Sequence, residues 1–262
     1  MTDHGGGAGR DLWVVVPGYN EAAWIGGAID GLAAQEGAAP FTVLVVDNAS
    51  TDDTAGAARV AAARHPDLDV RVLREDEKGT GAASDSGFRH AIARGATFVL
   101  RTDADCVPDP DWVATMRGAL EHGPLDLVAG NLRQRTDDGM GSRLGPVLVP
   151  AVLALIRFIG RVRPNNNDNP DYRGPFVVTP GANLGIRAET YLACGGFPRT
   201  SIEEAHEDKE IVNRVRLVSD RIGFCRESMV RFSNRRVARN GLLRVLRWYF
   251  NHGGGGAEVD VR

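Results

Sequence analysis

Cysteine is scarce in this chain of 262 residues. The three cysteines, Cys106, Cys194 and Cys225, lie far apart in the sequence. This number and spacing argue against a disulfide framework and against a zinc site built from cysteines. Because unpaired thiols are typical of reducing compartments, we expect the cysteines to be free and the protein to be cytoplasmic.

A basic charge balance and long apolar runs are also missing. The formal net charge is −3, which gives no indication of binding to nucleic acid. Residues 1–10 are Gly-rich and polar, without the basic start and apolar stretch of a signal peptide. The uncharged segment 144–156 is shorter than the ~18–20 residues that span a bilayer. It fits either a buried or lid helix, or a peripheral contact with a membrane surface or a lipid acceptor.

Apolar runs alternate with helical patterns along the first half of the chain. We expect strands at 12–16, 43–46, 70–73 and 97–100, and helices at 24–35, 50–64, 79–94 and 109–121. In the second half we expect strands at 125–129 and 181–187, helices at 207–218 and 242–250, and loops at 131–143 and 165–170. Strands that alternate with helices predict an α/β fold, in which helices cover both faces of a mostly parallel sheet.

Three polar clusters follow the expected strands 12–16, 43–46 and 97–100. They comprise residues 17–21, 47–50 and 102–105. In α/β sheets ligands bind beyond the carboxyl ends of the strands. The clusters therefore predict a binding site along one rim of the sheet.

Two carboxylates in the third cluster suit a hard metal ion. Asp103 and Asp105 are one residue apart, directly after a buried strand. Mg²⁺ and Mn²⁺ prefer oxygen ligands, and Mg²⁺ is commonly held by one or two carboxylates together with substrate phosphates. The pair predicts a phosphorylated, nucleotide-linked substrate and Mn²⁺ or Mg²⁺ as cofactor.

The motifs of the chain, in their order and spacing, resemble the family 2 glycosyltransferases with the GT-A fold. The matching elements are Val-Pro-Gly-Tyr-Asn-Glu (16–21), Val-Val-Asp-Asn-Ala-Ser-Thr-Asp-Asp-Thr (45–54), Lys-Gly-Thr-Gly-Ala-Ala (78–83), Asp-Ala-Asp (103–105), Gly-Ala-Asn-Leu-Gly-Ile-Arg (181–187), Gly-Gly-Phe (195–197) and Glu-Asp (207–208). The resemblance implies a Rossmann-like, mostly parallel sheet with a smaller acceptor-side region. It implies one catalytic domain over 11–252, with a nucleotide-binding half (11–107) and an acceptor half (108–252), between a flexible N-terminus (1–10) and a flexible tail (253–262).

The resemblance also implies roles for individual residues. Asp105 would bind the metal, Asp103 would contact the metal or the ribose, and His252 would be a possible third ligand. Asp208 would be the catalytic base, with Glu207 as the competing base. The sugar and acceptor pocket would be lined by Gly181, Ala182 and Asn183. The donor would be bound by Pro17, Tyr19, Asn20, Glu21, Asp47, Asn48, Lys78, Gly79, Asp103, Ala104, Arg235 and Arg236.

The reaction implied is transfer of one sugar from a nucleoside-diphosphate sugar to an acceptor hydroxyl, with inversion. A metal would neutralise the leaving diphosphate, and a carboxylate would remove the proton of the hydroxyl. Processive synthases of this broad group carry Gln-x-x-Arg-Trp, whereas this chain has Arg244 at the place of the glutamine before Arg247-Trp248. Single-sugar transfer is therefore favoured.

Simpler interpretations stay open for several residues. Asp47 could cap a helix, and Asn48 stands where many family members have a second aspartate. Lys78 could be a surface lysine, Arg235 and Arg236 could form a basic surface, and His252 could be a frayed terminal residue. Glu207 and Asp208 could lie on a solvated helix face.

Other functions remain as alternatives. A non-catalytic nucleotide-sugar-binding protein would keep the donor site without turnover. The Asp-x-Asp-x-Val pattern at 103–107 also fits haloacid-dehalogenase-like phosphatases, but those carry it on the first strand. A sugar-1-phosphate nucleotidyltransferase would need a Gly-rich basic loop after the first strand. An oxidoreductase that binds a dinucleotide would need Gly-x-Gly-x-x-Gly there, and the sequence has neither.

Overall fold

The computed structural model describes residues 11–136, 154, 158, 160, 166–199, 207–233 and 235. Several predicted features lie outside these residues: the two termini, most of the apolar segment 144–156, the helix at 242–250, Arg236 and His252. Among the described helices, none combines the length and the hydropathy needed to cross a membrane.

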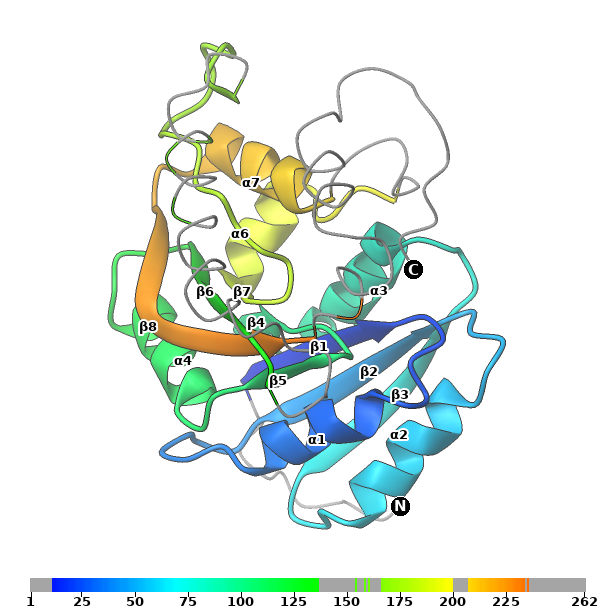
Figure 1. The fold of residues 1–262 in the computed structure, drawn as a ribbon. Coiled ribbons are helices and arrows are strands. Elements are labelled where there is room, and N and C mark those ends of the chain that lie inside the picture. Colours follow the sequence, from blue (N-terminus) through cyan, green and yellow to red (C-terminus); the bar gives the residue numbers. More distant parts are fainter. Residues whose placement is uncertain are drawn as a thin grey trace, which may run out of the picture.

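The first half of the chain forms alternating strands and helices, as the apolar pattern predicts (Figure 1). The elements are β1 (Leu12–Gly18), α1 (Ile25–Ala33), β2 (Thr42–Asn48), α2 (Thr54–Ala63), β3 (Asp69–Glu75), α3 (Thr80–Ile92) and β4 (Phe98–Arg101).

The second half is less regular and contains shorter elements. They are β5 (Cys106–Pro108), α4 (Trp112–Glu121), β6 (Leu127–Gln134), β7 (Leu184–Arg187), α6 (Ala188–Ala193), α7 (Glu207–Val218) and β8 (Ile222–Phe232).

The strands form one sheet of eight strands in the order β3-β2-β1-β4-β7-β6-β8-β5. β3, β2, β1 and β4 are mutually parallel. β7 is antiparallel to both β4 and β6, whereas β8 is parallel to β6 and antiparallel to the short β5. The predicted fold class, α/β with a mostly parallel central sheet, is confirmed.

Each face of the sheet is covered by its own set of helices. In β1 and β2 successive residues alternate between the two hydrophobic clusters, as the side-chain period of two in a strand requires. One cluster contains residues of α1, α2 and α4, and the other contains residues of α3, α6 and α7. Figure 1 shows α1 and α2 on one side of the sheet and α3, α6 and α7 on the other. Burial on both faces explains the continuous apolar runs of the inner strands.

Two predicted helix starts are wrong by a few residues. α2 begins at Thr54 rather than at residue 50, because Asp53 is the N-cap and its Oδ1 accepts from the Gly56 N–H at 3.1 Å. α4 begins at Trp112 rather than at Asp109. The Asp109 carboxylate instead pairs with Arg133 of β6 and Arg231 of β8.

The sequence pattern also missed some strands. Residues 131–134, predicted as a loop, continue β6 by pairing with 229–232 of β8. The segments that form β5, β8 and α6 were not predicted as regular elements at all. β8 carries charged residues in its interior, so its sequence lacks the apolar signature of a buried strand.

Candidate active site

The loops after β1 and β2 are joined through Asn20. Its Oδ1 accepts from the N–H groups of Thr51 at 2.8 Å and Asp52 at 3.3 Å, and its own N–H donates to Ser50 Oγ at 3.0 Å. Asn20 has φ of 56°, a left-handed conformation that asparagine tolerates better than most residues. The first two polar clusters therefore form one connected edge beyond the carboxyl ends of the strands.

The Asp47 and Asn48 side chains are buried at the end of β2. Asp47 Oδ1 accepts from the Ser50 N–H at 3.2 Å, so it closes the turn that follows the strand. The Asn48 amide accepts from the Gly79 N–H at 2.8 Å and donates to the Glu77 carbonyl at 2.6 Å. Asn48 thus holds the turn before α3, and its side chain is engaged inside the protein.

This contact leads to a prediction for the Asn48→Asp variant. A carboxylate at position 48 keeps an acceptor for the Gly79 N–H but loses the donor to the Glu77 carbonyl. We expect the free energy of unfolding to fall by ~1–3 kcal/mol, the cost of a buried group left unsatisfied. Urea denaturation at neutral pH measures this change, and an unchanged midpoint would contradict the described role of the amide.

The Lys78 side chain lies over a predicted donor residue. Its Nζ is 5.7 Å from the centroid of the Tyr19 ring, within the range of a cation–π contact. Gly79 is the N-cap residue of α3 and has φ of 140°. The structure therefore brings the 78–79 turn beside the loop that follows β1.

Asp105 and Glu21 share one cation. Arg235 Nε is 2.9 Å from Asp105 Oδ2, and its Nη2 forms an ion pair with Glu21 Oε1. The guanidinium also lies 5.6 Å from the centroid of the Trp24 ring. Of the two predicted C-terminal donor residues, Arg235 is thus placed at the proposed metal-binding carboxylate. Ala104, between the two aspartates, is buried.

Arg101 is a central residue of this site that the sequence reasoning missed. It is the last residue of β4, between β1 and β7, and only 2% of it is exposed. Its guanidinium nitrogens lie 3.2 Å from Asp103 Oδ1, 3.4 Å from Glu207 Oε1 and 3.4 Å from Asp208 Oδ1. A single buried cation thus joins carboxylates that are more than 100 residues apart in sequence. The available signal was an arginine that ends an apolar strand two residues before the first aspartate of Asp-x-Asp.

The Asp208 carboxylate is held from two sides at the N-terminus of α7. Its Oδ1 faces Arg101, and its Oδ2 accepts from the Gly181 N–H at 3.0 Å. A Cβ at position 181 would lie 2.3 Å from Asp208 Oδ1 and 2.9 Å from Arg101 Cζ. Only glycine fits this position without displacing both charged groups. The first turn of a helix also favours a carboxylate.

The charge state of Asp208 is shifted toward the neutral form. Burial raises the pKa of Asp208 to about 7, and the carboxylates of Glu207 and Asp103 add to the shift. Arg101 and the Gly181 N–H oppose it. About 36% of the side chain is still exposed, so a bound molecule can reach it. A carboxylate with this pKa is suited to accept a proton near neutral pH.

The Asn183 side chain is engaged inside the protein. It is fully buried, and its Oδ1 accepts from Trp112 Nε1 at 2.8 Å and from Ser228 Oγ at 3.0 Å. Its Nδ2 donates to the Asn131 carbonyl at 2.8 Å. The side chain therefore ties α4, β6 and β8 together, and we do not include it in the proposed acceptor pocket. Ala182 is also mostly buried, whereas Gly181 contacts Asp208 through its N–H.

The carboxylates near β4 fit a hard divalent cation by their chemistry. Asp103 and Asp105 offer oxygen ligands only. Each forms an ion pair with an arginine, Asp103 with Arg101 and Asp105 with Arg235. Among the described residues no group of three or more His, Cys, Asp or Glu side chains is arranged to hold a metal ion. Mg²⁺ needs no such group when one or two carboxylates act together with substrate phosphates and water.

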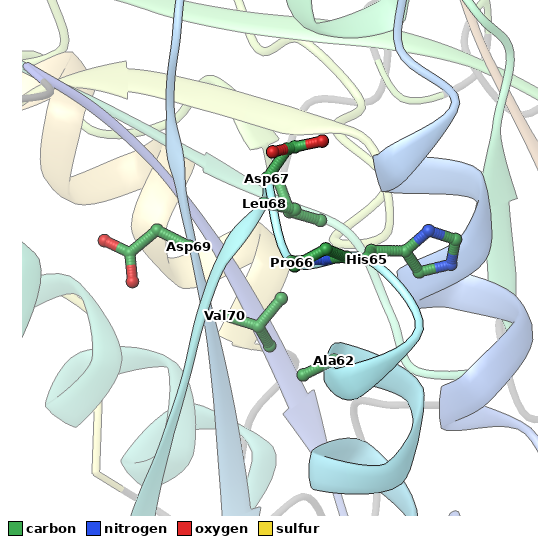
Figure 2. Close-up of a pocket in the computed structure, with 7 residues that line it drawn as sticks. All are labelled: Ala62, His65, Pro66, Asp67, Leu68, Asp69 and Val70. Carbon is green, nitrogen blue, oxygen red and sulfur yellow. The ribbon is translucent and has the colours of Figure 1, made fainter.

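A cavity of about 460 Å³ lies elsewhere, at the connection between α2 and β3 (Figure 2). It is lined by Ala62, His65, Pro66, Asp67, Leu68, Asp69 and Val70. β3 begins at Asp69, so this cavity lies at the amino end of the strands, opposite the rim that carries the carboxylates. It is separate from the candidate active site.

Comparisons with known proteins identify the family of the chain. The family model for glycosyl transferase family 2 matches residues 13–179. Glycosyltransferase AglE of Haloferax volcanii is 29% identical over 120 residues, which are 45% of this chain and 38% of that protein. The undecaprenyl-phosphate mannosyltransferase of Micrococcus luteus is 32% identical over 119 residues, 45% of this chain and 47% of that protein. The match thus spans less than half the length of either relative.

A solved structure has the same fold over most of the chain. The mannosyltransferase PcManGT from Pyrobaculum calidifontis, in complex with GDP-Man and Mn²⁺, superposes with a TM-score of 0.64 at 23% identity. The superposition covers 94% of this chain and 66% of that one. With the family match over more than half of the sequence, the chain belongs to glycosyl transferase family 2 and has the GT-A fold.

Proposed function

We propose that the protein transfers a single sugar from a nucleoside-diphosphate sugar to an acceptor hydroxyl, with inversion at the anomeric carbon. The observation that carries this proposal is the shared contact of Arg101 with Asp103 and Asp208. The donor-side and acceptor-side carboxylates predicted from distant motifs thereby meet at one place. In the proposed division of the chain, 11–107 binds the nucleotide and 108–252 supplies the acceptor side.

On the donor side, Asp105 and Asp103 would hold Mn²⁺ or Mg²⁺. The bound ion supplies Lewis-acid neutralisation of the charge that develops on the leaving diphosphate. Mn²⁺ in the GDP-Man complex of the structurally similar mannosyltransferase supports this assignment. Arg235, which pairs with Asp105, would contact the diphosphate as a second cation. The joined loops around Asn20 and Asp47 would bind the nucleoside.

On the acceptor side, Asp208 acts as the general base. It takes the hydroxyl proton while the oxygen forms a bond to the anomeric carbon, and the bond from that carbon to the diphosphate oxygen breaks. The nucleoside diphosphate leaves with the bonding electron pair, and one displacement inverts the configuration. Glu207 is the competing base, and its contact with the same Arg101 supports keeping it as the alternative.

A ligand screen tests the proposed donor class. We expect nucleoside diphosphates and their sugars, GDP-mannose and UDP-glucose among them, to raise the melting temperature in the presence of Mn²⁺. Stabilisation grows with ligand concentration relative to the dissociation constant, so the shifts rank the donors. Release of nucleoside diphosphate then separates an enzyme from a non-catalytic binding protein, which would bind the donor without turnover. No shift with any nucleotide would refute the proposal.

The pKa of Asp208 predicts the pH dependence of the reaction. Only the ionised carboxylate can accept a proton, so activity is lost as the pH falls through about 7. We expect kcat/KM to decrease about tenfold per pH unit on the acid side, since kcat/KM reports the groups of the free enzyme. Initial rates from pH 5.5 to 8.5 measure this limb, with nucleotide affinity over the same range as the control. A limb below pH 5 would contradict the assignment.

A further inference from the structure

We infer that Arg101 is a positioning residue, which fixes the orientation of the Asp208 carboxylate for proton transfer. This inference rests on the proposed function, because it gives Arg101 a part in the same site. Three features support it. Arg101 is buried, it contacts three carboxylates, and the Gly181 N–H binds the second oxygen of the Asp208 carboxylate.

The position of Arg101 in the sheet restrains its guanidinium group. Alternation along β4 places its side chain on the same face as Val99, which belongs to the cluster formed with α3, α6 and α7. Hydrogen-bonded strands flank Arg101 on both sides. The guanidinium lies 5.6 Å from the centroid of the Phe197 ring. The charged group is thus fixed at the base of the site, beneath the N-terminus of α7.

The contacts of Asp208 leave room for an acceptor. Each carboxylate oxygen has one described partner, Arg101 for Oδ1 and the Gly181 N–H for Oδ2. An ionised carboxylate has about four acceptor positions, so lone pairs remain for a hydroxyl. Because the partners are a buried cation and a backbone amide, the carboxylate is restrained without being covered.

Arg101 also compensates the negative charge of the carboxylates around it. Among the residues that the structure describes, the charged groups that face Asp208 are Arg101 and the carboxylates of Glu207 and Asp103, with the Gly181 N–H as the neutral donor. The Arg101 guanidinium lies within 3.4 Å of all three carboxylates, so its positive charge offsets part of theirs. Without this cation, the three carboxylates would repel one another in a partly buried space.

Turnover of a donor tests the inference. The reaction is Mn²⁺-dependent hydrolysis of GDP-mannose or UDP-glucose, whichever stabilises the wild type more, with water in place of the acceptor. In Arg101→Met we expect kcat to fall about 100-fold or more, while the dissociation constant of the matching nucleoside diphosphate changes less than about threefold. Arg101→Lys keeps a positive charge and should be at least about tenfold faster than Arg101→Met.

Arg187→Met is a matched control for structural damage. Arg187 lies at the other end of the β4–β7 pair, where its guanidinium donates to the carbonyls of Leu120 and Leu125. We expect this variant to melt at a lower temperature and to keep the wild-type kcat. Wild-type turnover in Arg101→Met would overturn the inference. So would a parallel loss of kcat, nucleotide affinity and stability that Arg187→Met reproduces, or equal turnover in Arg101→Met and Arg101→Lys.

A stability cycle reports on the contact without any activity. At pH 8, Asp208→Asn should raise the melting temperature more in the Arg101→Met background than in the wild type, because it removes a carboxylate that has lost its cation. Equal shifts in the two backgrounds would overturn the inference. If the wild type turned over no donor, the proposed function would fail while the cycle would still decide whether Arg101 and Asp208 are coupled. A coupled pair with normal turnover in Arg101→Met would reject the positioning role.

Discussion

Asp208→Asn is expected to reduce sugar transfer by about three orders of magnitude, within the range that a general base contributes. Asparagine has nearly the same shape, and its carbonyl can still accept from the Gly181 N–H. The variant therefore loses the base and the ion pair with Arg101, and it keeps the contact with the Gly181 N–H. Nucleotide affinity in the presence of Mn²⁺, measured by thermal shift or calorimetry, should stay within about threefold of the wild type.

Glu207→Gln is the matched control, since it alters the neighbouring carboxylate in the same helical turn. Both residues face Arg101, so a general loss of negative charge would affect the two variants alike. We expect Glu207→Gln to retain most of its turnover. An active Asp208→Asn variant together with an inactive Glu207→Gln variant would assign the base to Glu207 instead.

Asp105→Asn is expected to remove the metal dependence of donor binding. The substitution takes one charge from the two proposed metal ligands and also removes an ionic partner of Arg235. In the wild type, Mn²⁺ should increase the stabilisation by GDP or UDP, and in the variant this increase should disappear. Manganese binding followed by electron paramagnetic resonance gives a second readout that is independent of turnover.

Asp69→Asn serves as the control for this second prediction. Asp69 begins β3 at the opposite edge of the sheet, where it pairs with Arg71 at 2.9 Å. The variant has the same change in charge and should bind Mn²⁺ and nucleotide like the wild type. Wild-type manganese affinity in Asp105→Asn would exclude Asp105 as a metal ligand.

The inner part of the fold could be predicted because its physical signal is local. β1, β2 and β4 are buried on both faces, and each therefore appears in the sequence as a continuous apolar run. β8 and the end of β6 depend on pairing with each other, and their polar residues give no such signal. The start of α4 was misplaced because the Asp109 side chain pairs with arginines of β6 and β8, which are far away in the sequence.

The candidate site could be predicted only in part, for a similar reason. Motif resemblance nominated Asp103, Asp105 and Asp208, but it could not show that Arg101 joins two of them. An arginine in a strand has no assignable partner until the chain folds, because here its partners lie up to 107 residues away. The resemblance implies a place for Asn183 in the acceptor pocket, and the sequence does not reveal that Trp112 and Ser228 donate to its amide oxygen.

The shared hydrogen bonds of Asn20 also bear on how this protein could be re-engineered. The segment after β1 takes its shape from backbone groups of the segment after β2, and the reverse is true as well. A chimera that exchanged only one segment with that of another family member would leave donors and acceptors of the other unmatched. Exchange of the proposed nucleoside site between family members therefore requires grafting both segments as a unit.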